Sequence, residues 1–328
     1  MERNILITGG AGYIGSHLNK ALNQAGYHTV IFDNLARGSR DSVYYGEFFV
    51  GDINNEDDLK RLFEYHKFDA VMHLAALTDV GDSVQNPFSY YRTNVVGTLK
   101  LLDKMLEYDV RRCIFSSSAA VYGMPLSPIM KEEHPLSPIN PYGKSKLMCE
   151  FILDDYDHAY GLRYCSLRYF NAAGGDPKGE IKNYKSDEHN LIPKLLRCML
   201  KNDGNITIYG TDYPTRDGTC VRDYIHVNDI CNAHILALEH LLNGYPSSTY
   251  NLGNGNGFSV REVINAGLEA TGRKVNVIEG NRRAGDPPEL VADSTKARNE
   301  LGWTPQYPDI QTIVSHAWKS FSHLHSFA

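Results

Sequence analysis

A tyrosine and a lysine, Tyr142 and Lys146, stand four residues apart in the stretch "SPINPYGKSK". Four residues is about one helical turn, so both side chains would project from one face of a helix that begins here. A free tyrosine has a pKa of about 10, and a nearby ammonium group favours the phenolate and lowers that pKa. The two residue types suit a general base and its electrostatic partner, although the spacing alone also fits an ordinary helical turn.

Three serines precede this pair, at the end of "RCIFSSS". The apolar residues before them predict a buried strand, so Ser116, Ser117 and Ser118 are expected at the carboxyl edge of a sheet, where doubly wound folds bind ligands. A serine hydroxyl there can orient a reacting hydroxyl group for proton transfer. With a nicotinamide, this set would move a proton and a hydride. We interpret Ser118, Tyr142 and Lys146 as catalytic.

A glycine-rich turn follows the first predicted strand, in "ILITGGAGYIGSHLNKAL". Gly9, Gly12 and Gly15 lie between the strand and a helix, and Gly10 allows a second reading as G-x-G-x-x-G. Such glycines permit a tight turn and a close approach of backbone to a pyrophosphate, which the amino end of the helix then faces. The turn predicts a dinucleotide cofactor.

Two acidic residues end the second and third predicted strands. Asp33 follows Gly15 by eighteen residues and is placed to bond both ribose hydroxyls, where it would repel a 2′-phosphate. This favours NAD, although the nearby Arg37 leaves NADP open. Asp52 and Ile53 in "VGDIN" lie where an adenine edge is expected, but Asp52 fits a simple strand-ending turn equally well.

The chain alternates short apolar runs with helical patterns. Continuous apolar runs indicate strands that are covered on both faces, and the β-α-β order predicts an α/β, Rossmann-type doubly wound parallel sheet. Asn55 before "EDD" predicts a capped helix start. We expect an NAD-binding domain over residues 1–175 and a smaller mixed α/β substrate domain over 176–328, with segments around 220–242 packing back on the first. The predicted strands are "NILIT", "HTVIF", "EFFVG", "AVMHLA", "RCIFSSS" and "CSLRYF".

Composition excludes several classes of protein. The net charge of −6 gives no basic footprint for nucleic acid or an anionic membrane. Six scattered cysteines without a C-x-x-C pair, and the lack of a long apolar run, predict a cytoplasmic protein. No metal site is expected, because His73 and His226 lie singly in apolar runs and His323 and His325 lie in a polar tail.

Several long strings make the sequence similar to a known family. "TGGAGYIGSH", "SSSAAVYG" and "PYGKSK" resemble the extended short-chain dehydrogenase/reductase superfamily. "LRYFNAAG", "DGTCVRDYIHV", "YNLGNG" and "RRAGDPPELVADSTKA" resemble the UDP-glucose 4-epimerases within it, from Asn4 to about Trp303. The resemblance implies that a hydride passes from carbon 4 of a UDP-hexose to NAD while the tyrosine takes the hydroxyl proton. A 4-keto intermediate then turns over and is reduced on its opposite face, which interconverts UDP-glucose and UDP-galactose.

The resemblance also implies binding residues and an assembly. It implies a homodimer through the helices that begin near Asn94 and Tyr142. The implied cofactor contacts are Gly9, Gly12, Tyr13, Ile14, Gly15, Asp33, Asn34, Asp52, Ile53, Leu74, Ala75, Ala76, Asn94, Ser116, Tyr142, Lys146 and Tyr169. The implied UDP-sugar contacts are Ser118, Tyr142, Asn171, Asn190, Leu191, Tyr209, Arg222, Arg283, Asp286 and Leu290.

Departures from the family pattern leave alternatives open. Thr78 stands where many relatives carry a lysine that touches the cofactor, so this contact is expected to be replaced or lost. Leu290 stands where some members carry a tyrosine, so a larger pocket for an N-acetyl group is predicted, and with it UDP-GlcNAc and UDP-GalNAc as further substrates. A nucleotide-sugar 4,6-dehydratase is disfavoured, because Ala119 and Ala120 can transfer no proton. A UDP-pentose 4-epimerase stays open, and a non-enzymatic NAD-binding protein is the least favoured reading.

Overall fold

The computed structural model describes residues 3–181, 190–201, 204–283 and 285–322, and its largest sheet has seven strands. Every strand pair in this sheet is parallel, in the order β11-β7-β5-β4-β1-β2-β3. The predicted fold class is therefore confirmed. The strands are β1 (Asn4–Thr8), β2 (His28–Asp33), β3 (Glu47–Val50), β4 (Ala70–His73), β5 (Arg112–Ser118), β7 (Arg163–Tyr169) and β11 (Ser248–Leu252).

Helices cover both faces of this sheet, as its continuous apolar strands require. In β1, Ile5 and Ile7 pack into one hydrophobic cluster and Leu6 packs into another on the opposite face. Residues of α1 (Tyr13–Gln24), α8 (Val227–Leu242) and α10 (Thr295–Leu301) belong to the first cluster. Residues of α2 (Glu56–Tyr65), α5 (Gly97–Glu107) and α6 (Pro141–Tyr160) belong to the second.

The capped start of α2 is confirmed, since the Asn55 side chain accepts a hydrogen bond from the backbone N–H of Asp57 over 3.0 Å. The strand β3 differs from expectation because it lies at the edge of the sheet, where Val50 is 60% exposed. Its apolar run is therefore not covered on both faces. The strand β11 was not predicted from the sequence, although it completes the other edge.

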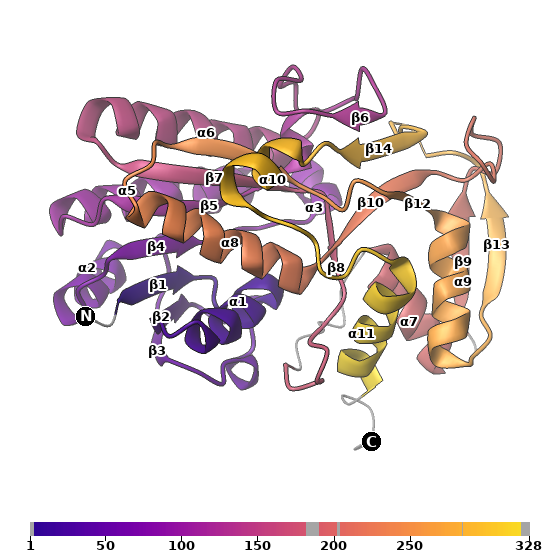
Figure 1. Cartoon of the computed structure of the whole chain (residues 1–328), viewed down its shortest axis with the longest axis horizontal. Helices are drawn as coiled ribbons and strands as arrows, with labels where there is room; N and C mark the ends of the chain where they lie inside the picture. Colours follow the sequence, from indigo (N-terminus) through magenta and orange to yellow (C-terminus); the bar gives the residue numbers. More distant parts are fainter. Residues whose placement is uncertain (1–2, 182–189, 202–203, 284, 323–328) are drawn as a thin grey trace.

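A second group of elements, drawn on the right of Figure 1, packs around its own apolar cluster. This cluster joins α7 (Leu191–Lys201), α9 (Val260–Thr271) and α11 (Ile310–Ser322) to β9 (Asn205–Tyr209), which pairs with β13 (Asn276–Gly280). A smaller sheet has the order β12-β10-β14-β6, and β8 also pairs with β10. Its strands are β6 (Ile129–Met130), β8 (Asn171–Ala173), β10 (Val221–His226), β12 (Gly257–Ser259) and β14 (Glu289–Ala292).

The chain passes back from this second group to the first sheet. The helix α8 follows β10 directly and packs on α1, and β11 then pairs with β7. The division into domains at residue 175 stays a prediction.

Short helical segments also join β4 to α5, namely α3 (Val80–Gln85), α4 (Pro87–Tyr90) and the π-helical turn η2 (Tyr91–Val96). Among the described residues, no helix is long and apolar enough to span a bilayer.

Candidate active site

The tyrosine and the lysine lie in the first two turns of α6. The Asn140 side chain caps this helix by accepting a hydrogen bond from the N–H of Gly143 over 2.8 Å, and Pro141 occupies its first position. Tyr142 is 9% exposed and Lys146 is 2% exposed, so the face that carries them is turned inward. The helical setting that the spacing predicted is confirmed.

Burial raises the pKa of the Tyr142 phenol, and a hydrogen bond with the Ser118 side chain opposes this. The direction is opposite to the sequence-based expectation, which counted positive charge but not the loss of water around the phenolate. Ser118 also accepts a hydrogen bond from the N–H of Ala120 over 3.2 Å. Its hydroxyl is therefore fixed at the end of β5, next to the phenol.

The Lys146 ammonium group is anchored to the neighbouring strand. Its Nζ donates to the backbone carbonyl of Ser116 over 2.6 Å and lies 4.8 Å from the centre of the Phe115 ring. Burial lowers the pKa of Lys146 to about 8, and the interactions with Cys149 and Glu150 act in the opposite direction. The group thus stays mostly protonated at neutral pH and places a positive charge one helical turn from Tyr142.

Asn94 supports the loop that follows β4. Its Oδ1 accepts from the N–H of Leu77 over 2.8 Å, and its Nδ2 donates to the Leu77 carbonyl over 3.0 Å and to Ser145 over 2.9 Å. Ser145 in turn donates to the Tyr142 carbonyl over 2.7 Å. Asn94 therefore ties this loop to the catalytic helix. The loop carries three of the residues assigned to the cofactor, Leu74, Ala75 and Ala76.

The glycine turn is packed too closely for larger residues. A Cβ added at Gly9, where φ is +72°, would lie 2.6 Å from the backbone nitrogen of Ala75. One added at Gly15 would lie 2.3 Å from the Gly9 carbonyl oxygen. The helix α1 begins directly after Gly12, which provides no side-chain cap, and its first turn holds no acidic residue. This amino end is therefore compatible with a phosphate.

The carboxylate of Asp33 lies beside this turn. Its Oδ2 accepts from the N–H of Ala11 over 3.0 Å and its Oδ1 accepts from the N–H of Leu35 over 2.8 Å. These bonds hold the carboxylate at the end of β2 in a position suited to a ribose. Asn34 and Asp52, assigned to the cofactor, are also together, with Nδ2 donating to Oδ2 over 3.0 Å.

The remaining residues assigned to the cofactor lie around the same edge of the sheet. Tyr13 donates its hydroxyl hydrogen to the Gly174 carbonyl over 2.9 Å, and Ile14 packs on the cluster beneath α1. Ile53 is buried in the cluster on the opposite face of the sheet. Thr78 is exposed in the loop after β4. The glycine cradle and the oriented carboxylate at β2 fit an NAD molecule.

Tyr169 lies at the end of β7, in register with Ser118 on β5. Its hydroxyl group is 2.6 Å from Nε2 of His234, whose Nδ1 is 3.0 Å from the Ile230 carbonyl oxygen. Since that carbonyl can only accept, Nδ1 carries the hydrogen and Nε2 accepts from Tyr169. His234 orients Tyr169, and no sequence signal pointed to it because the two residues lie far apart in the chain.

Several residues assigned to the UDP-sugar come together on β10, on β14 and in the segment just before β14. Arg222 contacts Asp286 over 3.3 Å and donates to the Pro287 carbonyl over 2.9 Å. Leu290 is paired with Arg222 across the two strands. Leu290 also packs against a cluster that contains Leu147 of the catalytic helix and Val121, which follows β5. This packing places β14 against the catalytic helix and the segment that follows β5.

The other assigned residues lie on neighbouring elements. The Arg283 guanidinium stands 3.7 Å from the centre of the Tyr209 ring, and hydrogen bonding to Arg283 lowers the pKa of Tyr209. Asn171 donates to the Asp223 carbonyl over 2.9 Å. Asn190 is exposed just before α7, and Leu191 begins that helix.

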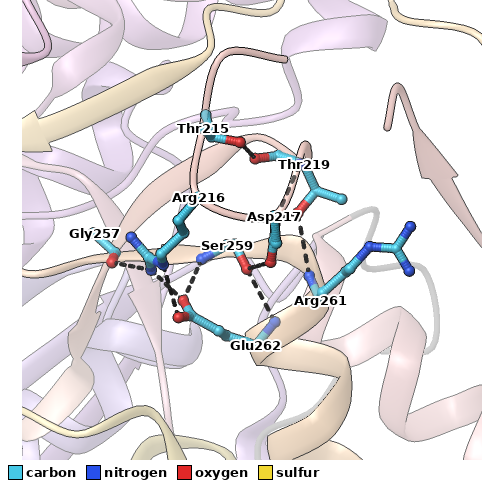
Figure 2. Close-up of polar contacts among 8 residues, drawn as sticks. All are labelled: Thr215, Arg216, Asp217, Thr219, Gly257, Ser259, Arg261 and Glu262. Atoms are coloured by element: carbon cyan, nitrogen blue, oxygen red, sulfur yellow. Dashed lines mark hydrogen bonds and ion pairs between the residues drawn. The ribbon is translucent and has the colours of Figure 1, made fainter. Parts of the chain in front are cut away.

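The loop that leads into β10 is fixed by polar contacts, shown in Figure 2. Arg216 forms an ion pair with Glu262 of α9, and its Nη2 donates to the Gly257 carbonyl over 2.7 Å. Asp217 accepts from the hydroxyl of Ser259 and from the N–H of Thr219 over 2.9 Å. The loop is thereby held against the start of α9, and β10 with its Arg222 follows it.

Sequence reasoning missed a buried group of polar residues beneath the catalytic helix. Glu150 binds Arg168 through both carboxylate oxygens, over 3.0 Å and 2.6 Å. Ser117 donates to the same carboxylate over 2.5 Å. Glu150 lies one further helical turn after Tyr142 and Lys146, so the sequence spacing could have indicated that it shares their helix face. No spacing pattern in the sequence indicated Arg168.

The comparisons with known proteins agree with this geometry. The model of the NAD dependent epimerase/dehydratase family matches residues 5–253. The chain belongs to this family. Membership confirms the predicted superfamily and NAD as its cofactor.

Among the described residues, no group of three or more histidine, cysteine or acidic side chains could hold a metal ion.

Members of this family with curated names cover nearly the whole chain. The UDP-glucose 4-epimerase of Halalkalibacterium halodurans is 48% identical over 314 residues, which are 96% of this chain and 94% of that protein. The UDP-glucose 4-epimerase of Rhizobium meliloti is 45% identical, with 97% and 96% covered. The predicted resemblance to UDP-glucose 4-epimerases is confirmed.

Solved structures of family members have the same fold. The UDP-glucose 4-epimerase from Brucella ovis in complex with NAD gives a TM-score of 0.94 at 45% identity, covering 97% of this chain and 98% of that one. The UDP-Glc/GlcNAc 4-epimerase from Campylobacter jejuni gives a TM-score of 0.88 at 41% identity, covering 98% and 99%.

Proposed function

We propose that the protein is an NAD-dependent UDP-glucose 4-epimerase that interconverts UDP-glucose and UDP-galactose through a 4-keto intermediate. The observation that carries this proposal is the half-buried Ser118 beside the buried Tyr142 and Lys146, at the carboxyl edge of the sheet that also holds the glycine turn and Asp33. Curated relatives of that name at 48% and 45% identity support it.

In this proposal the chain's own residues move one proton and hold the sugar. The Tyr142 oxygen takes the hydrogen of the sugar 4-hydroxyl and later returns it, and Ser118 orients that hydroxyl. Lys146 keeps a positive charge nearby and so favours the phenolate against the effect of burial. NAD, when bound, supplies the acceptor and donor of the hydride and a further positive charge.

The residues around the proposed substrate fit a nucleoside diphosphate sugar. Arg222 and Arg283 offer guanidinium groups for the diphosphate, and Tyr209, which Arg283 contacts, offers a ring for the uracil. The positions after Ser118 hold Ala119 and Ala120, which cannot donate a proton to a leaving hydroxyl group. An epimerase is therefore favoured over a 4,6-dehydratase.

A second substrate class follows from Leu290. It lies on β14 opposite Arg222 and packs against residues of the catalytic helix and of the segment after β5. Leucine is shorter than tyrosine, so we propose that UDP-GlcNAc and UDP-GalNAc are also accepted. The similar Campylobacter jejuni protein is named for both UDP-Glc and UDP-GlcNAc.

We also propose a homodimer and a cytoplasmic location. Several apolar side chains stay exposed on one helical layer, where Val96 is 43%, Met148 43% and Phe151 57% exposed. These support the predicted pairing of the helices near Asn94 and Tyr142 between two chains. Light scattering should give twice the mass of one chain.

The six free cysteines support the proposed cytoplasmic location, because the cytoplasm is a reducing compartment.

The test is to incubate the purified protein with UDP-galactose, UDP-N-acetylgalactosamine and UDP-arabinose in separate reactions and to identify each product by NMR. The proposal predicts UDP-glucose from the first and UDP-N-acetylglucosamine from the second. Conversion of UDP-arabinose alone would replace it with a UDP-pentose epimerase. A 4-keto-6-deoxy product would identify a dehydratase.

A further inference from the structure

Glu150 and Arg168 form a buried ion pair below the catalytic residues. Their exposed fractions are 6% and 5%, and the two groups share two hydrogen bonds, so the geometry is the bidentate one that arginine favours. A buried ion pair is weak evidence for stability, because removing both ions from water is unfavourable. A contribution to stability therefore does not explain why this ion pair is buried below the catalytic residues, and we look for a functional role.

The pair lies on the same helix face as the catalytic residues. Tyr142, Lys146 and Glu150 follow one another at intervals of one turn on α6. Glu150 also accepts a hydrogen bond from the Ser117 hydroxyl over 2.5 Å. The serines on either side of Ser117 contact the other two residues of this helix face. Ser116 accepts from Lys146, and Ser118 contacts Tyr142. Three turns of α6 are thus matched to three successive residues of β5.

Arg168 connects this arrangement to the substrate side. It precedes Tyr169 on β7, and its Nη1 donates to the Tyr122 hydroxyl over 2.9 Å. Tyr122 donates to the Asn251 side chain over 2.6 Å, and Asn251 donates to the carbonyl of Met130 over 3.0 Å. Met130 belongs to β6, which pairs with β14, the strand of Leu290. The pair is therefore the centre of a network from the catalytic helix to the proposed substrate strand.

We propose that Glu150 and Arg168 are positioning residues for the proposed epimerisation, which together hold Tyr142 and Lys146 in register with β5 while adding no net charge beneath them. This inference rests on the proposed function for its kinetic consequences. Neither residue is a catalytic residue, since both act through α6.

The charges around the pair set the direction of its electrostatic effect. Lys146 faces His73 of β4, the Phe115 ring of β5, and Cys149 and Glu150 of its own helix. Burial and the Lys146 charge lower the pKa of His73 to about 3, so it is neutral, and burial raises the pKa of Cys149 to about 11. Glu150 is then the anion that faces Lys146 among these groups. Glu150 itself faces Ser117, Arg168 and the Tyr164 phenol of β7, which is also neutral, because burial raises its pKa far above neutrality.

Two single substitutions should therefore act in opposite directions. Glu150→Gln leaves the Arg168 charge unopposed and makes the surroundings of Lys146 more positive. The pKa values of Lys146 and Tyr142 then fall, and the pH profile of kcat moves to lower pH by about one unit. Arg168→Gln leaves a buried anion and moves the profile to higher pH by a similar amount. A purely structural role would lower kcat in both without opposite shifts.

The control variant removes an ion pair between the same helix and strand. Asp157 of α6 contacts Arg163 of β7 over 2.9 Å near the protein surface. Asp157→Asn should leave the pH profile and kcat unchanged. Arg168→Lys keeps the positive charge but cannot form both hydrogen bonds to the Glu150 carboxylate. The pH profile of kcat should therefore stay in place while kcat itself falls. KM for UDP-galactose should change by less than about twofold.

A second readout does not depend on turnover. The side-chain ¹³C signals of lysine in the protein without added sugar are followed by NMR against pH, and Lys146→Met identifies the signal of Lys146. Its titration midpoint should fall in Glu150→Gln and rise in Arg168→Gln. If wild type does not convert UDP-galactose, the proposed function fails, and this titration still decides the inference.

The double variant Glu150→Gln/Arg168→Gln covers the case in which a single unpaired charge prevents folding. It leaves neither ion of this pair without its partner, so it should fold, with kcat reduced at least tenfold and KM nearly unchanged. Wild-type kcat in the folded double variant would overturn the inference. Single variants whose profiles and Lys146 midpoints do not move, or move in the same direction, would overturn it as well.

Discussion

At the scale of single residues, the proposed chemistry depends on a phenol that burial makes harder to ionise. Tyr142 gains only a hydrogen bond from Ser118 against the loss of water. In the proposed mechanism, the positive charge of Lys146, anchored on the Ser116 carbonyl, favours the phenolate. The site thus combines a base that needs positive charge with a fixed ammonium group one turn away.

Removing the phenolic oxygen tests this role. Tyr142→Phe should lower kcat with UDP-galactose by roughly 10²- to 10⁴-fold, the usual contribution of a general base, because only the proton acceptor is lost. Binding of NAD and of the UDP-sugar, measured by calorimetry, should be nearly unchanged. Tyr250→Phe is the matched control, since Tyr250 is a buried tyrosine whose hydroxyl bonds Glu300 instead. Equal rates for both variants would contradict the assignment.

The size of residue 290 should decide which sugars are accepted. Leu290→Tyr is expected to reduce kcat/KM for UDP-N-acetylgalactosamine on the order of 10- to 100-fold, because the ring would occupy the space of the acetyl group. UDP-galactose should be converted at a similar rate by both proteins. Leu290→Met keeps the volume and serves as control. If wild type does not convert the N-acetyl sugar, the proposal is wrong.

The catalytic residues could be predicted from sequence because they lie close together in the chain or directly after a strand. Tyr142 and Lys146 are one turn apart, and Ser118 ends an apolar run. Residues whose partners come from distant elements could not be found in this way. The partner of Tyr169 is His234, and that of Glu150 is Arg168, and neither pairing leaves a spacing pattern.

At the scale of elements, the loop before β10 and the first turn of α9 stabilise each other. Ser259 and Glu262 form a reciprocal capping box at the start of α9, and Asp217 and Arg216 of the loop bind the same two side chains. Because β10 begins two residues after Thr219, the contacts between the loop and the cap also help to fix the position of Arg222. A local helix start is thus linked to the proposed substrate contact.

Loss of this cap should lower stability. Ser259→Ala is expected to reduce the free energy of unfolding by about 1 kcal/mol, the usual effect of removing a capping serine, and to raise KM for UDP-galactose. Urea titration followed by circular dichroism measures the first effect. Ser39 precedes a short helical turn without a side-chain cap bond, so Ser39→Ala should leave the midpoint in place. An unchanged midpoint for Ser259→Ala would show that the cap contributes nothing.

The long central strands could be predicted because each is a continuous apolar run, as in "NILIT". The strand β6 could not, since it has two residues and two residues show no hydrophobic periodicity. The strand β11 was missed for another reason. Its polar residues make backbone and side-chain contacts, as Asn251 does with Met130, so it lacks an apolar run.

At the scale of the whole molecule, buried titratable groups make stability depend on pH. Four buried histidines have their pKa lowered by burial, to about 4 for His17 and His234 and to about 3 for His73 and His226. Below pH 6.5 the unfolded chain protonates these side chains while the folded chain does not. Burial raises the pKa of Asp223 and Asp229 to about 6, which acts in the opposite direction, because the folded chain then holds protons that the unfolded chain releases.

Among the described residues, these four histidines outnumber the three carboxyl groups whose pKa burial raises, Asp223, Asp229 and Glu132, so stability should fall as the pH is lowered from about 6.5 to about 4.5. Each proton that only the unfolded chain binds corresponds to about 1.4 kcal/mol per pH unit. Urea titrations of the protein without substrate at pH 7.5, 6.0 and 5.0 should show midpoints that decrease in that order. Midpoints that stay constant or rise would mean that these histidines are not neutral in the folded state.

The most direct test of the account follows one hydrogen atom. UDP-galactose that carries deuterium at carbon 4 is incubated with the enzyme in ordinary water, and the UDP-glucose formed is examined by NMR and mass spectrometry. We predict that the product keeps its deuterium at carbon 4, because the hydrogen removed from that carbon is returned to it within the same site. UDP-glucose with a solvent hydrogen at carbon 4 would contradict the account.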